Sequence, residues 1–524
     1  MSGIGDRHSG TAGGALNLGG RPISVEIRLG NDASRAAVQH SAWMLLNILC
    51  RLEGVVHTVR INCPPRVRTT RRLSPLIQTG GELMQALLRG AGAIGSSEEG
   101  FAAVEPAGQQ ASDLVISVGF EFNSDATFCA VGNGLCGGLF SRKIEAPKIF
   151  SELTIGPYIS ACLAAGEIFR LVRLSSYSPE RQLFLNALDY SHGADPVWSD
   201  LELRNEVQSV LLVGVGAVGS ALLHALYPLP LRGTVMAADN DLKGIDKTNL
   251  GRYSLFGWES LGKAKASEAT GLLGGARFQV LPHDGSFEYF FSKQNKPQIV
   301  LSAVDKNPAR HALQEQYAPL VLSASTHNLR AEVLRCGPPS MGACLACFNP
   351  LETEKHTEEE IRVLLQERPE MVALLCKKLR LSAADIAAWV RERKCSQTGD
   401  RLVEEFRTDD GSVAAFAVGF VSVLSGTMLA AELLKTISQY PGRLNETSNR
   451  AIFQFQNPAA VTNRAHFYSR DENCIACSSQ NIGVKVWMRR FNQFTEGRKT
   501  PGDHSKLPKV ETRPKKSHSG KVLH

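Results

Sequence analysis

The stretch Gln208–Leu226, QSVLLVGVGAVGSALLHAL, decides the fold of this 524-residue chain. It reads as a buried strand, Gln208–Gly214, followed by a glycine turn and an apolar helix. Glycines at such a turn let backbone amides approach a phosphate at the N-terminus of the next helix. An acid about twenty residues further on, Asp239 or Asp241, is placed to hold a ribose hydroxyl. Taken alone, the pattern predicts a nucleotide-binding unit of the kind typical of dinucleotides, and a merely tight strand–helix turn is the alternative. The three glycines of its turn are Gly214, Gly216 and Gly219.

Three further apolar runs read as strands of the same sheet, at Gly233–Asp239, Gln298–Asp305 and Leu320–Ala324. Strands that are apolar from end to end and alternate with helices are typical of a parallel sheet covered on both faces. Residues 200–350 are therefore predicted to form a doubly wound α/β domain.

Charged residues in a fixed order argue for nucleotidyl transfer rather than hydride transfer. Asn249-Leu250-Gly251-Arg252 follows the acid, Gly262-Lys263-Ala264-Lys265 begins a helix, and Asp305 precedes Arg310 by five residues. A nicotinamide already carries its reactive hydrogen and needs no such set. A departing pyrophosphate does need it, because Arg and Lys neutralise its charge and an Asp holds Mg²⁺.

Four cysteines in two CxxC pairs predict a structural zinc site. Two such knuckles supply four thiolates, which is the closed, tetrahedral type of zinc site. Two unrelated pairs, or a redox-active pair, are the alternatives. The four predicted ligands are Cys344, Cys347, Cys474 and Cys477.

Cys395 stands alone in a polar, glycine-containing stretch. The neighbouring Arg391, Arg393 and Lys394 favour a thiolate, so Cys395 is a candidate nucleophile, although a lone cysteine is usually structural. Cys376, in MVALLCKKL, reads instead as part of a helix core.

The rest of the chain supports a large, multidomain enzyme. The first 200 residues contain a buried-strand candidate, Asp113–Gly119, and a helix, Cys162–Val172, that resembles Met428–Ile437, so a degenerate second α/β unit is predicted there. The apolar run Ser412–Leu434 reads as a buried helix rather than a membrane span. The predicted segments are a disordered N-terminus (1–20), a degenerate lobe (21–200), the first part of the nucleotide domain (201–351), a helical insertion with Cys395 (352–411), the return of that domain (412–494) and a disordered basic tail (495–524).

In the order of these features the chain resembles the superfamily of ubiquitin-activating enzymes and their bacterial ThiF and MoeB relatives, over about 205–480. The resemblance implies a two-lobed fold in which the glycine loop and Asp239 or Asp241 bind ATP. The family spacing counted back from Asn249 selects Asp241 as the ribose ligand, whereas the spacing counted forward from Gly233 selects Asp239. It further implies that Asn249, Arg252 and Lys265 contact phosphates, that Asp305 serves Mg²⁺, and that Cys395 forms the thioester. Tyr253 departs from the family, which usually has Gln there.

The leading hypothesis is ATP-dependent activation of a ubiquitin-like protein that ends in glycine, with ATP, Mg²⁺ and Zn²⁺ as cofactors. A conjugating enzyme is a further expected partner and a homodimer is allowed, whereas nucleic acid and membrane are not expected. The alternatives are an adenylyltransferase for a sulfur-carrier protein, an NAD-dependent oxidoreductase and a non-catalytic zinc scaffold. Residues 1–20 lack an apolar core and the twelve cysteines form no disulfide framework, so a cytoplasmic protein is expected.

Overall fold

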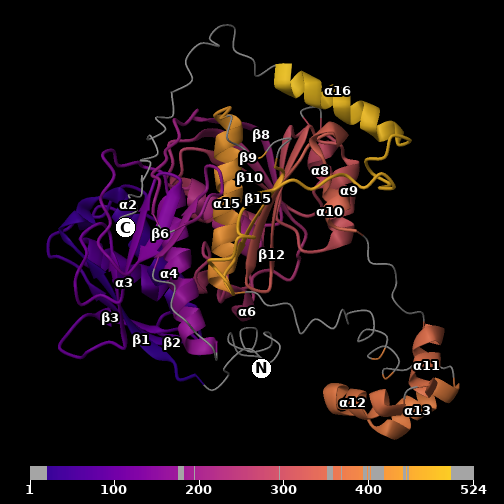
Figure 1. Ribbon diagram of the computed structural model, residues 1–524, viewed down its shortest axis with the longest axis horizontal. Coiled ribbons are helices and arrows are strands. Elements are labelled where there is room, and N and C mark those ends of the chain that lie inside the picture. Colours follow the sequence, from indigo (N-terminus) through magenta and orange to yellow (C-terminus); the bar gives the residue numbers. More distant parts are fainter. Residues whose placement is uncertain are drawn as a thin grey trace, which may run out of the picture.

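The computed structural model consists of two α/β lobes and a small helical cluster (Figure 1). It describes residues 20–174, 182–193, 195–293, 296–350, 358–367, 369–392, 398, 402, 418–440, 444 and 448–496. We call the described residues up to 200 the first lobe, and those from 201 to 350 and from 418 to 496 the second lobe. The segments predicted to be disordered at the two ends lie almost entirely outside the described residues.

The first lobe is built on a seven-stranded sheet. Its first five strands in sheet order are parallel and the last two are antiparallel. In that order the strands are β3 (Ala103–Pro106), β2 (Val56–Asn62), β1 (Ile23–Leu29), β4 (Leu114–Val118), β5 (Phe128–Asn133), β6 (Cys136–Phe140) and β7 (Gln182–Asn186).

The second lobe repeats this plan in an eight-stranded sheet, again with five parallel strands followed by antiparallel ones. In sheet order the strands are β10 (Gln279–Asp284), β9 (Arg232–Asp239), β8 (Glu206–Val213), β11 (Ile299–Ser302), β12 (Leu320–His327), β13 (Arg330–Cys336), β14 (Arg450–Gln454) and β15 (Ala465–His466). Because seven strands match one for one in order and direction, the predicted degenerate copy in the N-terminal half is confirmed.

The central strands are apolar throughout because both of their faces are buried. On β8, Val210 and Leu212 belong to the large core shared by the two lobes, whereas Leu211 and Val213 belong to a second core on the other face. This is the pattern expected of a parallel sheet between two layers of helices. One strand is shorter than predicted. β11 ends at Ser302, where the chain leaves the sheet, so Asp305 follows the strand instead of ending it.

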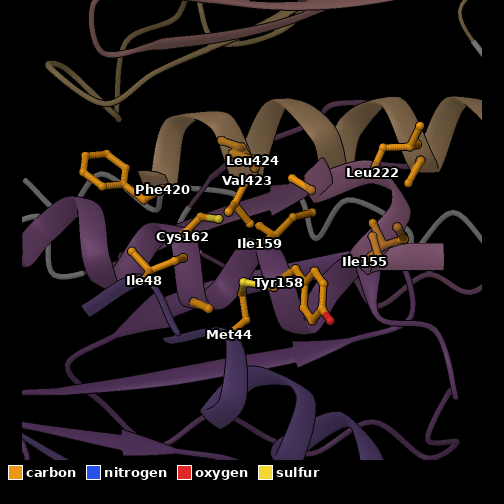
Figure 2. Close-up of a cluster of buried hydrophobic side chains, with 14 of the residues drawn as sticks. Met44, Ile48, Ile155, Tyr158, Ile159, Cys162, Leu222, Phe420, Val423 and Leu424 are labelled. Carbon is orange, nitrogen blue, oxygen red and sulfur yellow. The ribbon is translucent and has the colours of Figure 1, made fainter. Parts of the chain in front are cut away.

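Four helices form the apolar centre of the contact between the lobes, and Figure 2 shows their side chains packed together. Met44 and Ile48 of the first lobe face the same cluster as Phe420 and Leu424 of the second lobe. The four helices are α2 (Ala36–Cys50), α4 (Ile155–Arg173), α5 (Ala217–Leu226) and α15 (Gly419–Ile437).

Two of these helices, α4 and α15, are long and apolar enough to cross a membrane by length and composition alone. In the structure, 94% of the most apolar window of α4 and 100% of that of α15 are buried inside the protein. A core helix of a large protein meets the same criteria. The burial of α15 agrees with the interpretation of the run at 412–434 as a buried helix.

The remaining helices lie on the sheets or in the insertion. In the insertion, α11, α12 and α13 pack on a small core of their own that includes Ile361, Leu375 and Trp389. α16 is held at two places, by the buried Trp487 beside the paired cysteines and by Phe494, which packs in the large core. These helices are α3 (Leu83–Ile94), α6 (Lys247–Leu250), α7 (Lys265–Leu272), α8 (Glu288–Phe291), α9 (Asn307–Glu315), α10 (Leu345–Phe348), α11 (Glu358–Glu367), α12 (Pro369–Leu379), α13 (Ala383–Glu392) and α16 (Ile482–Glu496). The short 3-10 turns are η1 (Asn31–Ser34), η2 (Trp258–Ser260), η3 (Leu273–Gly275) and η4 (Pro339–Met341).

Candidate nucleotide and metal sites

The glycine loop joins β8 to α5 at the point where the strand order of the second sheet reverses, which is where doubly wound folds bind ligands. Gly214 has φ +90, and a Cβ on it would lie 2.7 Å from the carbonyl oxygen of Ala303. A Cβ on Gly219 would lie 1.9 Å from the carbonyl oxygen of Gly214. Gly216 is the N-cap of α5 and offers no side chain to the first helical turn. The amides of that turn are therefore available to an anion.

The two candidate ribose ligands have different neighbours. Asp239 ends β9 beside the glycine loop, and its Oδ2 accepts a hydrogen bond of 2.7 Å from the Val215 amide. Asp241 lies two residues further on, and its Oδ2 is 2.5 Å from Nζ of Lys265. That hydrogen bond holds the pKa of Asp241 below its usual value. The end of the second strand is the position from which doubly wound folds bind ribose, and Asp239 occupies it.

Lys265 brings a buried cation to the same region. Only 6% of the residue is exposed, because it begins α7 against the lobe core. Burial alone would lower its pKa, but Tyr253, Asp241 and Asp239 outweigh burial and raise it, so the amine stays protonated. The ring of Tyr253 lies 5.8 Å both from Nζ of Lys265 and from Cζ of Arg252.

Tyr253 is a member of this site that sequence reasoning treated only as a departure from the family pattern. It is 4% exposed, and its hydroxyl is 3.6 Å from the position that a Cβ on Gly216 would take. Burial raises its pKa, which keeps the phenol neutral. The structure thus places a hydroxyl beside the glycine loop, and its position directly after Arg252 was the only sequence signal for it.

Asn249 and Arg310 make contacts within the protein. The side chain of Asn249 forms a capping box with Asp246 at the start of α6, so the contacts that the structure describes for it are structural. The guanidinium of Arg310 donates to the carbonyl oxygen of Val304 (3.1 Å) and to the side chains of Asn307 and Asn349 (both 2.8 Å). Arg310 therefore fixes the loop that carries the exposed Asp305.

The four predicted zinc ligands come together although the two pairs are far apart in the sequence. Their Sγ atoms all lie within 4.8 Å of one another. The measured separations are 3.7 Å for Cys344–Cys347, 3.7 Å for Cys344–Cys474 and 3.4 Å for Cys347–Cys477. A disulfide needs about 2 Å, whereas four sulfurs around a tetrahedral zinc at a bond length of about 2.3 Å lie about 3.8 Å apart. The cluster can hold a metal such as zinc.

The equivalent loop of the first lobe is already filled by acidic side chains. After β1 the chain turns through η1, where the Asn31 amide donates to Glu121 (2.7 Å) and the Phe120 amide donates to Asp32 (2.7 Å). Burial raises the pKa of Asp32, and the nearby Glu121 carboxylate raises it further. The carboxylates of Asp32 and Glu121 accept from these two amides and repel an anion, so the glycine loop of the second lobe remains the candidate nucleotide site.

The candidate nucleophile Cys395 lies outside the described residues, as do its neighbours Arg393 and Lys394. Arg391, in the last turn of α13, is exposed. Cys376 lies on α12 and is partly buried against the small core of the insertion, as expected of a helix-core cysteine.

These features together indicate a nucleotide-binding enzyme of the adenylating class. They are the two-lobed α/β fold, the glycine loop at its switch point, the buried lysine beside that loop and the cluster of four cysteines. The chain belongs to the ThiF family, which it matches over residues 181–476, more than half of its length. Membership in this family indicates an ATP-using adenylyltransferase.

Individual relatives are distant. The uncharacterized protein y4jF of Sinorhizobium fredii (strain NBRC 101917 / NGR234) is 25% identical over 372 residues, which cover 64% of this chain and 71% of that protein. Among solved structures, E. coli MccB with MccA-N7isoASN has a TM-score of 0.36 at 16% identity and covers 52% of this chain and 67% of its own. E. coli MccB with ATP has a TM-score of 0.34 at 15% identity, covering 52% and 66%. These TM-scores are too low to transfer residues or substrates.

Proposed function

We propose that the second lobe uses ATP to adenylate the C-terminal carboxylate of a ubiquitin-like protein, and that Cys395 then holds this protein as a thioester. The observation that carries the proposal is the buried cation of Lys265, 2.5 Å from Asp241, beside a glycine loop closed by Asp239. Phosphate chemistry explains a buried lysine at this place, since a cation there stabilises the charge that develops on a leaving pyrophosphate.

In the adenylation step a carboxylate oxygen of the modifier attacks the α-phosphorus of ATP. The bond from that phosphorus to the bridging oxygen breaks, and pyrophosphate leaves with the electron pair. We assign the phosphates to the glycine loop, Asn249, Arg252 and Lys265, and the ribose to Asp239, with Asp241 orienting Lys265.

Asp305 is the proposed ligand of Mg²⁺, which when bound neutralises charge on the phosphates. Its exposed position two residues beyond Ala303, whose carbonyl packs on the glycine loop, supports the assignment. Arg310 holds the loop in this arrangement.

In the second step the thiolate of Cys395 attacks the acyl carbon of the adenylate. The bond between that carbon and the phosphate oxygen breaks, and AMP leaves. The cationic residues near Cys395 in the sequence favour the thiolate form. A sulfur-carrier adenylyltransferase would share the first step and lack this one.

Replacing Cys395 by Ala is expected to separate the two steps. With ATP, Mg²⁺ and a ubiquitin-like protein ending in glycine, the variant should still exchange labelled pyrophosphate into ATP but lose the reductant-sensitive adduct on a non-reducing gel. Cys376→Ala is the matched control and should lose neither, because its thiol packs in the insertion core. An adduct that survives in the Cys395 variant places the nucleophile elsewhere. If the wild-type chain exchanges pyrophosphate but forms no adduct, the result favours the hypothesis of an adenylyltransferase for a sulfur-carrier protein.

A further inference from the structure

We infer that the first lobe takes part in catalysis, because Asn47 of α2 and Arg51, the C-cap of that helix, hold the segment of the second lobe that carries Arg252. This segment, residues 249–258, runs from the capping box of α6 to η2. The inference rests on the proposed function, since it gives Asn47 and Arg51 the part of positioning residues for the phosphate contact.

Arg51 binds the segment on both sides of Arg252. Its guanidinium donates to the carbonyl oxygens of Leu250 (2.5 Å) and Phe256 (2.7 Å). The residue is 2% exposed, and no carboxylate of the described residues forms an ion pair with it. A buried guanidinium without an acid is costly unless its N–H groups are bonded. Here two main-chain carbonyls of the other lobe and the side chain of Asn47 accept from them, so burying the Arg51 charge depends on the conformation of that segment.

Asn47 adds a third bond and aligns the first two. Its Nδ2 donates to the carbonyl oxygen of Ser254 (2.8 Å), and its Oδ1 accepts from Nε of Arg51 (2.7 Å). Asn47 is fully buried. The carbonyls at 250, 254 and 256 are thus all held by the C-terminal end of α2 and its C-cap, and Arg252 lies between the first and the second of them.

The far end of the segment rests on a second element of the first lobe. A Cβ on Gly257 would lie 2.3 Å from the carbonyl oxygen of Ala93 on α3, so the two backbones are in direct contact. The ring of Trp258 meets that of Phe101 edge to face at 6.1 Å. The segment is therefore fixed between α2 and α3.

The bonds of Asn47 and Arg51 are not needed merely to hold the two lobes together. The apolar cluster of α2, α4, α5 and α15 already joins them (Figure 2). The polar bonds of Asn47 and Arg51 instead converge on the few residues that surround Arg252. A misplacement of about 1 Å in a contact to the transition state can lower the rate by about 10²-fold. Loss of the bonds from Asn47 and Arg51 is therefore expected to lower the rate of adenylation.

The test compares full-length, zinc-loaded variants by two measurements. Arg51→Met keeps the bulk of the side chain and removes both of its bonds to the segment, whereas Asn47→Ala removes one bond to the segment together with the acceptor of Arg51 Nε. Hydrogen exchange of the amides of 249–258, without nucleotide, should be about tenfold faster in Arg51→Met and less affected in Asn47→Ala. Pyrophosphate exchange should fall about 10-fold to 100-fold in Arg51→Met, with partial recovery in Arg51→Lys.

Arg173→Met is the matched control, because Arg173 donates to the carbonyl oxygen of Gly54 (2.8 Å) within the first lobe. It should change neither measurement. Unchanged hydrogen exchange at 249–258 in a zinc-loaded Arg51→Met protein overturns the inference whatever the activity. Faster hydrogen exchange with undiminished pyrophosphate exchange also overturns it. If wild type itself shows no pyrophosphate exchange, the proposed function fails separately, and hydrogen exchange still decides whether α2 holds the segment.

Discussion

Lys265→Ala is expected to lower pyrophosphate exchange by about 10²-fold or more, the usual cost of removing one charge contact to a transition state. Lys265 is the buried cation next to the glycine loop, and its partner Asp241 keeps it in place. Arg252→Ala should have an effect of the same size. Asp305→Ala should abolish exchange, because the pyrophosphate would lose its metal.

The matched control for Lys265 lies two residues earlier. Lys263 has a half-exposed side chain and pairs with Glu268 at 3.2 Å, so Lys263→Ala should leave exchange within about twofold of wild type. Equal losses in both lysine variants would show that the effect is not specific to the buried cation. Normal exchange in Asp305→Ala would remove the magnesium assignment.

Cys344→Ser is expected to release zinc and to destabilise the second lobe by about 4 kcal/mol or more, since loss of a structural metal is among the most costly single changes. Wild type should purify with one zinc ion per chain. Elemental analysis gives the zinc content, and thermal unfolding gives the stability. ATP chemistry should fail only through misfolding of the lobe, because none of the four cysteines is among the residues proposed to contact ATP.

The control for this variant is Cys336→Ala. Cys336 is also fully buried, and the charge of Cys347 acts on it together with burial to raise its pKa, yet it does not belong to the cluster of four. Its replacement should keep the zinc. A well-folded wild-type protein without zinc would contradict the assignment of the four cysteines.

The fold could be predicted where burial dominates the sequence. β8, β9 and β12 are apolar on both faces, and the glycines of the loop are the residues that its backbone contacts demand. The sequence of the first lobe indicates an α/β repeat less clearly, because its turn after β1 has Asp32 in place of a glycine loop. Only the equivalence of the two strand orders makes the repeat plain.

Contacts between distant residues could not be predicted from local patterns. Counting along the chain left Asp239 and Asp241 equivalent, and three-dimensional contacts with Val215 and Lys265 distinguish them. The bonds from Arg51 to residues 250 and 256 join positions about two hundred residues apart, and nothing near Arg51 in the sequence announces them. The end of β11 at Ser302 is not evident from the sequence, because Ala303 and Val304 continue the apolar run after the strand has left the sheet.

Equilibrium binding of nucleotides to the full-length protein tests the central claim most directly. Isothermal titration with ATP and Mg²⁺ should give saturable binding that weakens strongly in Lys265→Ala and is retained in Lys263→Ala, whereas NAD should give none. Binding of NAD without binding of ATP would contradict the account and support the hypothesis of an NAD-dependent oxidoreductase. Binding of neither nucleotide would also contradict it and would support the hypothesis of a non-catalytic zinc scaffold.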